Sequence, residues 1–338
     1  MSPIKAILGA ALASVALAIS APAAAQNLDK LKVRLDWTPW GVQAPFHLAM
    51  QKGWFKQAGL DVTLEDGNGS VTTVQLVGSS DQFDVGHAAL APMMIARDKG
   101  LPVKAVAVFA RQSDVGLLVP QGAGIKGPKD LKGKKIAYTT GSLEAPFIDA
   151  FLASGGLKRS DVELVSVDAA GKAATYAAGR TDAAFSSVPF FLPVVSATRP
   201  SEGILFAQAG LHMPSFGIVA SEDKLKAKRD AIMRFASVTA GAWQYINDGH
   251  QDEAVDAIVA QRPQAKLDKK VLRGQIDALK PHFNSSNSSG QPIGVNVEKD
   301  WAEAVKTLVS ANVIKSNADP KSFYEPDMVR PEIFKKLK

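Results

Sequence analysis

The sequence contains no cysteine among its 338 residues. Disulfide bonds, thiolate metal sites and a cysteine nucleophile are therefore excluded. Stability has to come from an ordinary apolar core, and a chain of this length is long enough to bury one. The length also favours two domains over one.

Catalytic motifs are absent as well. The chain has no G-x-S-x-G, no H-E-x-x-H and no phosphate-binding loop. The glycines at 122–127 have the G-x-G-x-x-G spacing, but they lack the following helix that a dinucleotide-binding turn needs. Its five histidines stand far apart without ligand spacing, so we expect no metal and no cofactor. Basic residues are scattered among acidic ones at a net charge of +6, which predicts a solvated surface and no nucleic-acid partner.

Long apolar runs are confined to the N-terminal segment. Lys5 is followed by an uncharged run over residues 6–19, and small residues at 23–25 precede Gln26. This order is typical of a secretory signal peptide with an A-x-A cleavage site. The run of about 14 residues is too short to span a bilayer, which argues against the alternative of a retained anchor. We therefore predict a signal peptide over 1–25, no lipid attachment because no cysteine follows it, and a periplasmic protein.

The rest of the chain alternates short strands with helices that end at glycine. This alternation predicts parallel sheets with right-handed crossovers. Two such runs followed by a helical tail predict an α/β fold with two lobes. The predicted strands cover residues 31–35, 61–64, 83–85, 103–109, 116–119, 135–138, 162–167, 182–185 and 216–220. The predicted helices cover 43–56, 89–97, 172–178, 227–247, 253–261, 269–281 and 297–311, with two more beginning at Ser70 and Ser142.

The second α/β run reads as an insertion into the first lobe. We expect one lobe to comprise 27–112 plus 217–338 and the other 113–216, with the chain crossing between them over 106–113 and 215–219. Ligands of open α/β sheets bind outside the carboxyl ends of the strands. The residues that follow each strand are therefore the candidates for a cleft between the lobes.

The loop after the first strand is the strongest candidate. It places Asp36, Trp37 and Trp40 within five residues, beside a rigid proline. Indole faces offer flat apolar area and a carboxylate accepts hydrogen bonds, which suits a planar ligand with N–H groups. The alternative is that one of the indoles packs under the edge of the sheet.

Other strand ends supply small polar groups. Ser70, Thr140 and Ser142 stand where helices begin and could donate to the polar edge of a ligand, although plain helix capping explains them equally well. His87 follows the third strand as a weaker candidate, and a lone histidine is commonly structural. Ser186 ends a strand of the second lobe and could face the tryptophan loop.

The sequence resembles the NMT1/THI5-like solute-binding proteins over about residues 30–220. The pattern of this family runs roughly D-W-T-P, a helix, then A-x-x-x-G-(F/W/Y)-F-x-x-x-G-L-x-V. The matching stretches are LDWTP at 35–39, AMQKGWFKQAGLDV at 49–62, DVG at 84–86, GLPVKAV at 100–106, IKGPKDLKGKK at 125–135 and AGRTDAA at 178–184.

The resemblance implies a periplasmic-binding-protein type II fold, with the ligand cleft between two lobes, that serves the permease of an ABC importer. Members bind thiamine-related pyrimidines, riboflavin, alkanesulfonates, taurine, nitrate or aromatic acids, and 36–39 is most similar to the pyrimidine-precursor branch. The chain departs from that branch in having Trp40 where asparagine is common and Gln43 where histidine is common. The stretch 187–190 also lacks the carboxylate expected to hold an aminopyrimidine.

These features together predict a monomeric, non-catalytic protein that binds a small planar or aromatic, pyrimidine-like solute. One alternative is an alkanesulfonate, taurine or another small organic anion. Another is an enzyme similar to the pyrimidine synthase of this family, whose branch is cytoplasmic and uses a cysteine-rich segment. A third, the sensing domain of a regulator, would need a DNA-binding or membrane-spanning segment that the sequence does not display.

Overall fold

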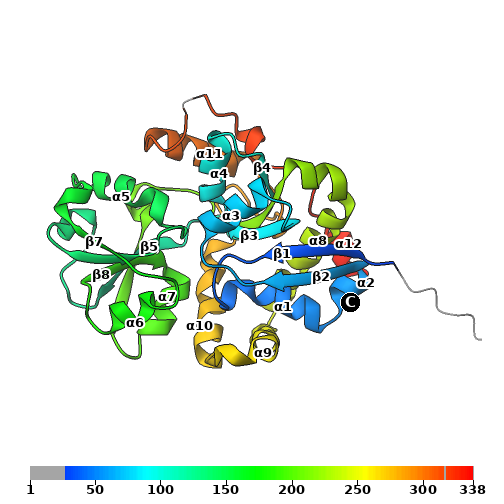
Figure 1. Cartoon of the computed structure of the whole chain (residues 1–338), viewed down its shortest axis with the longest axis horizontal. Helices are drawn as coiled ribbons and strands as arrows, with labels where there is room; N and C mark the ends of the chain where they lie inside the picture. The colour runs from blue at the N-terminus through cyan, green and yellow to red at the C-terminus, as the bar shows by residue number, and fades with distance from the viewer. Residues whose placement is uncertain (1–26, 316, 338) are drawn as a thin grey trace, which may run out of the picture.

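The computed structural model describes residues 27–315 and 317–337, so the predicted signal peptide lies outside the described residues. Two five-stranded sheets, each covered by helices, form two lobes that lie side by side in Figure 1. The first lobe contains both the N-terminal strands, in blue and cyan, and the C-terminal helices, in yellow-green to red, whereas the second lobe is green. Among the described residues, no helix has the length and apolar character needed to cross a membrane.

The sheet of the first lobe has the strand order β2-β1-β3-β10-β4. β1 pairs in parallel with β2 and β3, whereas β10 runs antiparallel to both of its neighbours. The strands are β1 (Asp29–Arg34), β2 (Leu60–Glu65), β3 (Val85–Ala89), β4 (Val103–Val108) and β10 (Phe216–Ser221).

The sheet of the second lobe has the order β7-β6-β8-β5-β9. β6 pairs in parallel with β7 and β8, and β5 runs antiparallel to β8 and β9. The strands are β5 (Val115–Pro120), β6 (Lys135–Tyr138), β7 (Glu163–Ser166), β8 (Ala183–Ser187) and β9 (Ser201–Leu205).

Both sheets are therefore mixed, and the expectation of purely parallel sheets was wrong. The exceptions have one cause, because β5 and β10 each follow directly on a segment that crosses from the other lobe. A strand that enters in this way needs no crossover helix and can run against its neighbours.

The helices cover the faces of the two sheets. In the first lobe, α8 packs on α1, α2 and the sheet, and α9 packs on α1. The helices of this lobe are α1 (Ala44–Gln51), α2 (Trp54–Gln57), α3 (Ser70–Ser79), α4 (Leu90–Asp98), α8 (Glu222–Asn247), α9 (Gln251–Gln261), α10 (Lys269–Leu279), α11 (Glu298–Ser310) and α12 (Pro331–Lys335). Those of the second are α5 (Ile148–Ser154), α6 (Lys172–Ala177) and α7 (Val188–Val195).

Two segments connect the lobes and are bonded to each other. The sheets change over between Val108 and Val115 and again between Leu205 and Phe216. The amide of Phe109 donates to the carbonyl of Phe216 at 2.9 Å, and the amide of Ser215 donates to that of Ala110 at 2.9 Å. The lobe boundaries at 113 and 216 stay a prediction from the sequence.

Several predicted elements differ in detail. The helix expected over 43–56 is broken at Gly53, whose φ of 70° is left-handed and ends α1 before α2 begins. Gly69 rather than Ser70 occupies the cap of α3, and Ser142 precedes α5 by several residues without capping it. α7 was not predicted, because two prolines within 189–193 obscured the helical pattern of an apolar run. β9 was not predicted either.

Candidate functional site

A small cavity lies between the lobes, beside the tryptophan loop. Its volume is about 10 Å³, close to that of a single water molecule. The first lobe contributes its lining from the loop after β1, the start of α3 and the start of β10. The second lobe contributes from the end of β8, from α7 and from the start of α6. The lining residues are Asp36, Trp37, Trp40, Ser70, Leu143, Lys172, Ser186, Ser187, Phe190 and Phe216.

Asp36 organises the tryptophan loop (residues 36–40) through hydrogen bonds to its carboxylate. Its Oδ2 atom accepts a 2.9 Å hydrogen bond from Trp40 Nε1, and its Oδ1 atom accepts one of 3.1 Å from Gln43 Nε2. His87 Nδ1 lies 3.0 Å from the same Oδ1 atom. A buried carboxylate needs such partners, and these three hold the indole of Trp40 in one orientation.

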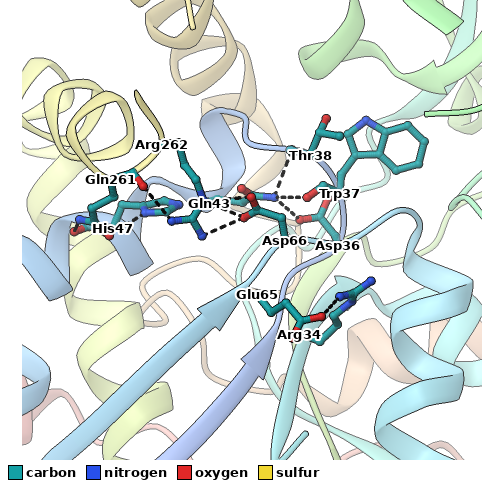
Figure 2. A network of polar contacts seen from close by, with 10 residues as sticks. All are labelled: Arg34, Asp36, Trp37, Thr38, Gln43, His47, Glu65, Asp66, Gln261 and Arg262. Carbon is teal, nitrogen blue, oxygen red and sulfur yellow. Dashed lines mark hydrogen bonds and ion pairs between the residues drawn. The ribbon is translucent and has the colours of Figure 1, made fainter. Parts of the chain in front are cut away.

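A larger polar network supports this loop from the side away from the cavity (Figure 2). The amide nitrogen of Gln43 also donates to the carbonyl of Trp37 at 3.1 Å. Further back, His47 Nδ1 lies 2.9 Å from Gln261 Oε1, and Arg262 Nε donates to both oxygens of Asp66 at 3.0 and 2.9 Å. Burial lowers the pKa of His47 to about 4, so this histidine is neutral at pH 7.

Asp66 begins the loop that leads into α3. The amide of Gly67 donates to the carbonyl of Trp37 at 3.0 Å, and the amide of Gly69 donates to that of Asp36 at 2.8 Å. A Cβ atom on Gly67 would lie 2.1 Å from the Leu35 carbonyl oxygen, so only glycine allows this approach. The two loops of the first lobe are thereby joined into one wall of the cavity.

Aromatic rings from both lobes meet across the cavity. The ring of Phe190 lies edge-on to both indoles, with centroid distances of 6.2 Å to Trp37 and 5.3 Å to Trp40. Phe216 lies edge-on to Trp40 at 5.4 Å. Such pairs contribute about 0.5–1.5 kcal/mol each beyond the area they bury.

A buried ion pair forms the wall of the second lobe. Lys172 Nζ donates to Glu144 Oε1 at 2.8 Å and to the carbonyl of Phe185 at 3.0 Å. The side chains are 1% and 0% exposed. The ammonium also lies 5.3 Å from the ring centroid of Trp37, a cation–π distance across the two lobes.

Two contacts tie the lobes together next to the cavity. Gln275 of α10 accepts a 2.9 Å hydrogen bond from the amide of Gly41 and donates one of 2.9 Å to the carbonyl of Phe190. The amide of Val71 at the start of α3 donates to the carbonyl of Gly141 at 3.0 Å. One side chain of the C-terminal helices therefore bridges the two walls.

Not all of the residues proposed from the sequence lie on the cavity. Asp36, Trp37, Trp40, Ser70 and Ser186 line it, and His87 lies behind Asp36. Two residues are placed elsewhere. The hydroxyl of Ser142 donates to the carbonyl of Thr139, and exposed Thr140 lies 3.2 Å from Ser166.

Sequence reasoning missed half of the lining. Ser187 comes next after Ser186 at the end of the predicted strand 182–185, so the rule that singled out Ser186 could have found it. Phe190 lies on the unpredicted helix α7. Lys172 and Glu144 are 28 residues apart, and no sequence pattern relates them.

A larger hollow of about 670 Å³ lies elsewhere, between α5, the segment 209–212 and α11. Its lining is mainly alanine and polar side chains and contains no phenylalanine, tyrosine or tryptophan. Ligand pockets combine apolar and aromatic walls with a few convergent polar groups. The small cavity has this character, so we place the candidate site there despite its smaller volume.

Comparison with known sequences identifies one family and several relatives. The sequence profile described as NMT1/THI5 like matches residues 40–254, more than half of the chain. A protein of Saccharomyces cerevisiae, named 4-amino-5-hydroxymethyl-2-methylpyrimidine phosphate synthase THI11, is 33% identical over 140 residues. The alignment covers 41% of this chain and 41% of the yeast protein, so the chain spans less than half of that curated relative.

Solved structures share the whole fold. A protein of Bordetella bronchiseptica RB50 superimposes with a TM-score of 0.73 at 25% identity, covering 92% of this chain and 98% of that protein. The alkanesulfonate-binding protein SsuA of Xanthomonas axonopodis pv. citri, solved with bound MOPS, gives a TM-score of 0.67 at 16% identity, covering 88% and 98%. The chain therefore has the two-lobed fold of periplasmic binding proteins, which confirms the predicted fold class.

Proposed function

The chain belongs to the NMT1/THI5-like family, and from this premise we propose that it is a periplasmic substrate-binding protein of an ABC importer. It binds a small planar, pyrimidine-like solute and delivers it to the membrane permease. The observation that carries this proposal is the cavity between the lobes, in which Trp37, Trp40, Phe190 and Phe216 surround a few polar groups. Flat apolar walls with few polar groups suit a planar ring.

Binding on this proposal requires the lobes to move. A cavity of about 10 Å³ is far too small for a pyrimidine, so the walls must part to admit one and then close on it. The two bonded crossing segments are the natural hinge, because they alone join the sheets along the chain. Small-angle scattering should report a smaller radius of gyration with ligand than without, and equal radii would count against hinge closure.

The ligand is found by screening the secreted protein, which on this proposal begins near Gln26. A thermal-shift panel of pyrimidines, flavins, aromatic acids and alkanesulfonates should single out one planar class, because a ligand that binds only the folded state raises the melting temperature. N-terminal sequencing of protein exported by a bacterial host checks the cleavage site.

Calorimetry on variants then tests the site. Trp37→Ala and Trp40→Ala should each weaken binding by about 5- to 150-fold, the equivalent of about 1–3 kcal/mol for a lost indole contact. Trp54→Ala is the matched control, since this indole packs on Tyr245 and Phe334 away from the cavity. If the two cavity variants fold and bind as tightly as the parent, the site lies elsewhere.

Two alternatives have specific support. The yeast relative is named as a synthase, which favours an enzyme, and the SsuA neighbour was solved with a sulfonate buffer, which favours a small organic anion. We propose binding without chemistry. Mass spectrometry of the solute released from the protein should recover it unchanged, whereas a transformed product would support the enzyme. The alkanesulfonates in the thermal-shift panel test whether the protein binds a small organic anion instead.

A further inference from the structure

Hydrogen-bond acceptors on the first-lobe wall of the cavity are largely engaged. The carboxylate of Asp36 already receives Trp40 Nε1 and Gln43 Nε2, and His87 Nδ1 lies within bonding distance. Two carboxylate oxygens offer about four acceptor positions, and three are taken. A ligand that comes with several N–H donors therefore meets little free acceptor capacity at Asp36.

Donors that line the cavity are left over, whereas the acceptor atoms Gln43 Oε1 and Glu144 Oε2, also unpartnered in the part of the chain that the structure describes, belong to residues behind its lining. The indole Nε1 atom of Trp37 is buried and has no hydrogen-bond partner among the described residues. The ammonium of Lys172 carries three N–H groups, of which two are used by Glu144 and Phe185. Both side chains line the cavity, and the ammonium lies 5.3 Å from the ring of Trp37.

The buried position of Lys172 needs an explanation beyond stability. Two charges taken out of water recover their desolvation cost only in part, and apolar residues in their place are often no less stable. Glu144 Oε1 also accepts from the amide of Thr139 at 3.3 Å, so the carboxylate is fixed to the backbone. Glu144 thus holds the Lys172 side chain in one place at the wall of the cavity.

We propose that Lys172 determines which planar solute is bound, by donating its third N–H to an oxygen acceptor on the edge of the ring. The preferred solute carries a carbonyl, carboxylate or sulfonate oxygen where a disfavoured analogue carries an amine. Trp37 Nε1 is the second donor to the same edge, and Glu144 is a positioning residue that acts through Lys172. This inference rests on the proposed function, namely that the cavity receives a planar solute.

The test uses ligand pairs that share a ring and differ in one substituent. Uracil and cytosine exchange an oxo group for an amine, and benzoate, benzenesulfonate and benzylamine compare two anions with a cation. Calorimetry on the parent protein should give at least about 10-fold tighter binding for the oxygen-bearing member of a pair, as expected for a hydrogen bond to a charged group. The uracil and cytosine pair tests a neutral oxygen acceptor, whereas benzoate and benzenesulfonate test an anionic one. Tighter binding of the amine overturns the inference.

The variant that isolates Lys172 is Lys172→Met combined with Glu144→Leu, which removes both charges together and leaves neither unpaired. It should lower the affinity for the oxygen-bearing member at least about 10-fold and that for the amine by less than about 3-fold. Lys158→Met, an exposed lysine of the same lobe, is the control and should change neither.

Equal losses for both members would overturn the role of Lys172 while leaving the proposed function intact. The proposed function fails separately, if no planar solute of any class binds the parent protein. Should the double variant not fold, the preference of the parent protein within each ligand pair still decides the inference.

Discussion

The two walls of the cavity achieve the same burial of charge by different means. On the first lobe, the carboxylate of Asp36 is stabilised by hydrogen bonds with indole, amide and imidazole groups that lie within its own loop or the adjoining strand. On the second lobe, Lys172 and Glu144 neutralise each other as an ion pair. The carboxylate of the first wall has three hydrogen-bond partners, whereas each charge of the second wall has a single charged partner. The second wall is thus the more fragile and, on our proposal, the more selective.

Breaking the ion pair should have the largest effect. Glu144→Leu leaves the ammonium of Lys172 buried with only a carbonyl partner and should lower the free energy of unfolding by about 3–5 kcal/mol. Adding Lys172→Met removes the remaining charge and should restore most of that loss. Urea unfolding at pH 7 measures both variants. A single variant that costs no more than about 1 kcal/mol would mean that water already reaches the pair.

Changing the carboxylate of the first wall should cost less. Asp36→Asn places an amide N–H₂ where one oxygen accepted, so at least one donor among Trp40, Gln43 and His87 loses its acceptor. We expect a loss of about 1–3 kcal/mol, the cost of an unpaired buried polar group. Thermal unfolding against Asp61→Asn, an exposed position on β2, provides the comparison. Equal stability of the two variants would remove Asp36 from its organising role.

The support of the first wall should also weaken in acid. Burial lowers the pKa of His47 to about 4 from 6.5, so the unfolded chain binds a proton more readily than the folded one between these values. The stabilising contribution is complete above about pH 6.5 and is lost as the pH falls toward 4. Between pH 7 and pH 5 the free energy of unfolding should drop by about 2 kcal/mol from this group alone.

His47→Asn checks that expectation, because its side-chain amide can still donate to Gln261 and has no charge to gain. Its unfolding free energy should depend less on pH than that of the parent over the same interval. If urea unfolding gives the two proteins the same pH dependence, His47 titrates near its ordinary pKa.

Loosening the bridge between the walls should have the smallest effect. Gln275→Leu removes two hydrogen bonds, one donated by the amide of Gly41 and one donated to the carbonyl of Phe190, each with a net contribution of about 1 kcal/mol. The first joins parts of the same lobe and the second joins the lobes. We expect a small increase in the radius of gyration by scattering, compared with Gln57→Leu at an exposed position. An unchanged radius of gyration would mean that the hydrogen bonds of Gln275 contribute to stability but do not hold the lobes together.

Most of the first wall could be predicted from the sequence because its parts are local, whereas Phe216 at the start of β10 was missed. Asp36, Trp40 and Gln43 lie within eight residues of a loop that follows a clear strand, and the strand-end rule places them at the edge of a sheet. The two-lobed α/β fold was predictable for the same reason, since each strand and helix carries its own periodicity. The sense of β5 and β10 was not, because it is set by the crossings and not by the strands themselves.

Apart from Ser186, the second wall was not predicted, because only the folded sheet brings its parts together. Lys172 begins a short helix after β7, and Glu144 lies in an irregular segment after β6. Read alone, each is an ordinary charged residue of the kind that usually faces solvent. The predicted site residues Thr140 and Ser142 lie in the same loop as Glu144. They precede the residue whose side chain does bind Lys172 by only a few positions.

The placement of the indoles has an optical consequence. All five tryptophans lie outside residues 113–216, so the second lobe contributes no indole emission of its own. Trp37 and Trp40 contact Phe190 across the cavity, whereas Trp54, Trp243 and Trp301 are buried within the first lobe and its C-terminal helices. Any parting of the lobes admits water to two indoles and leaves three in a constant surrounding. The intrinsic fluorescence of the unlabelled protein is therefore a built-in gauge of the gap between its lobes.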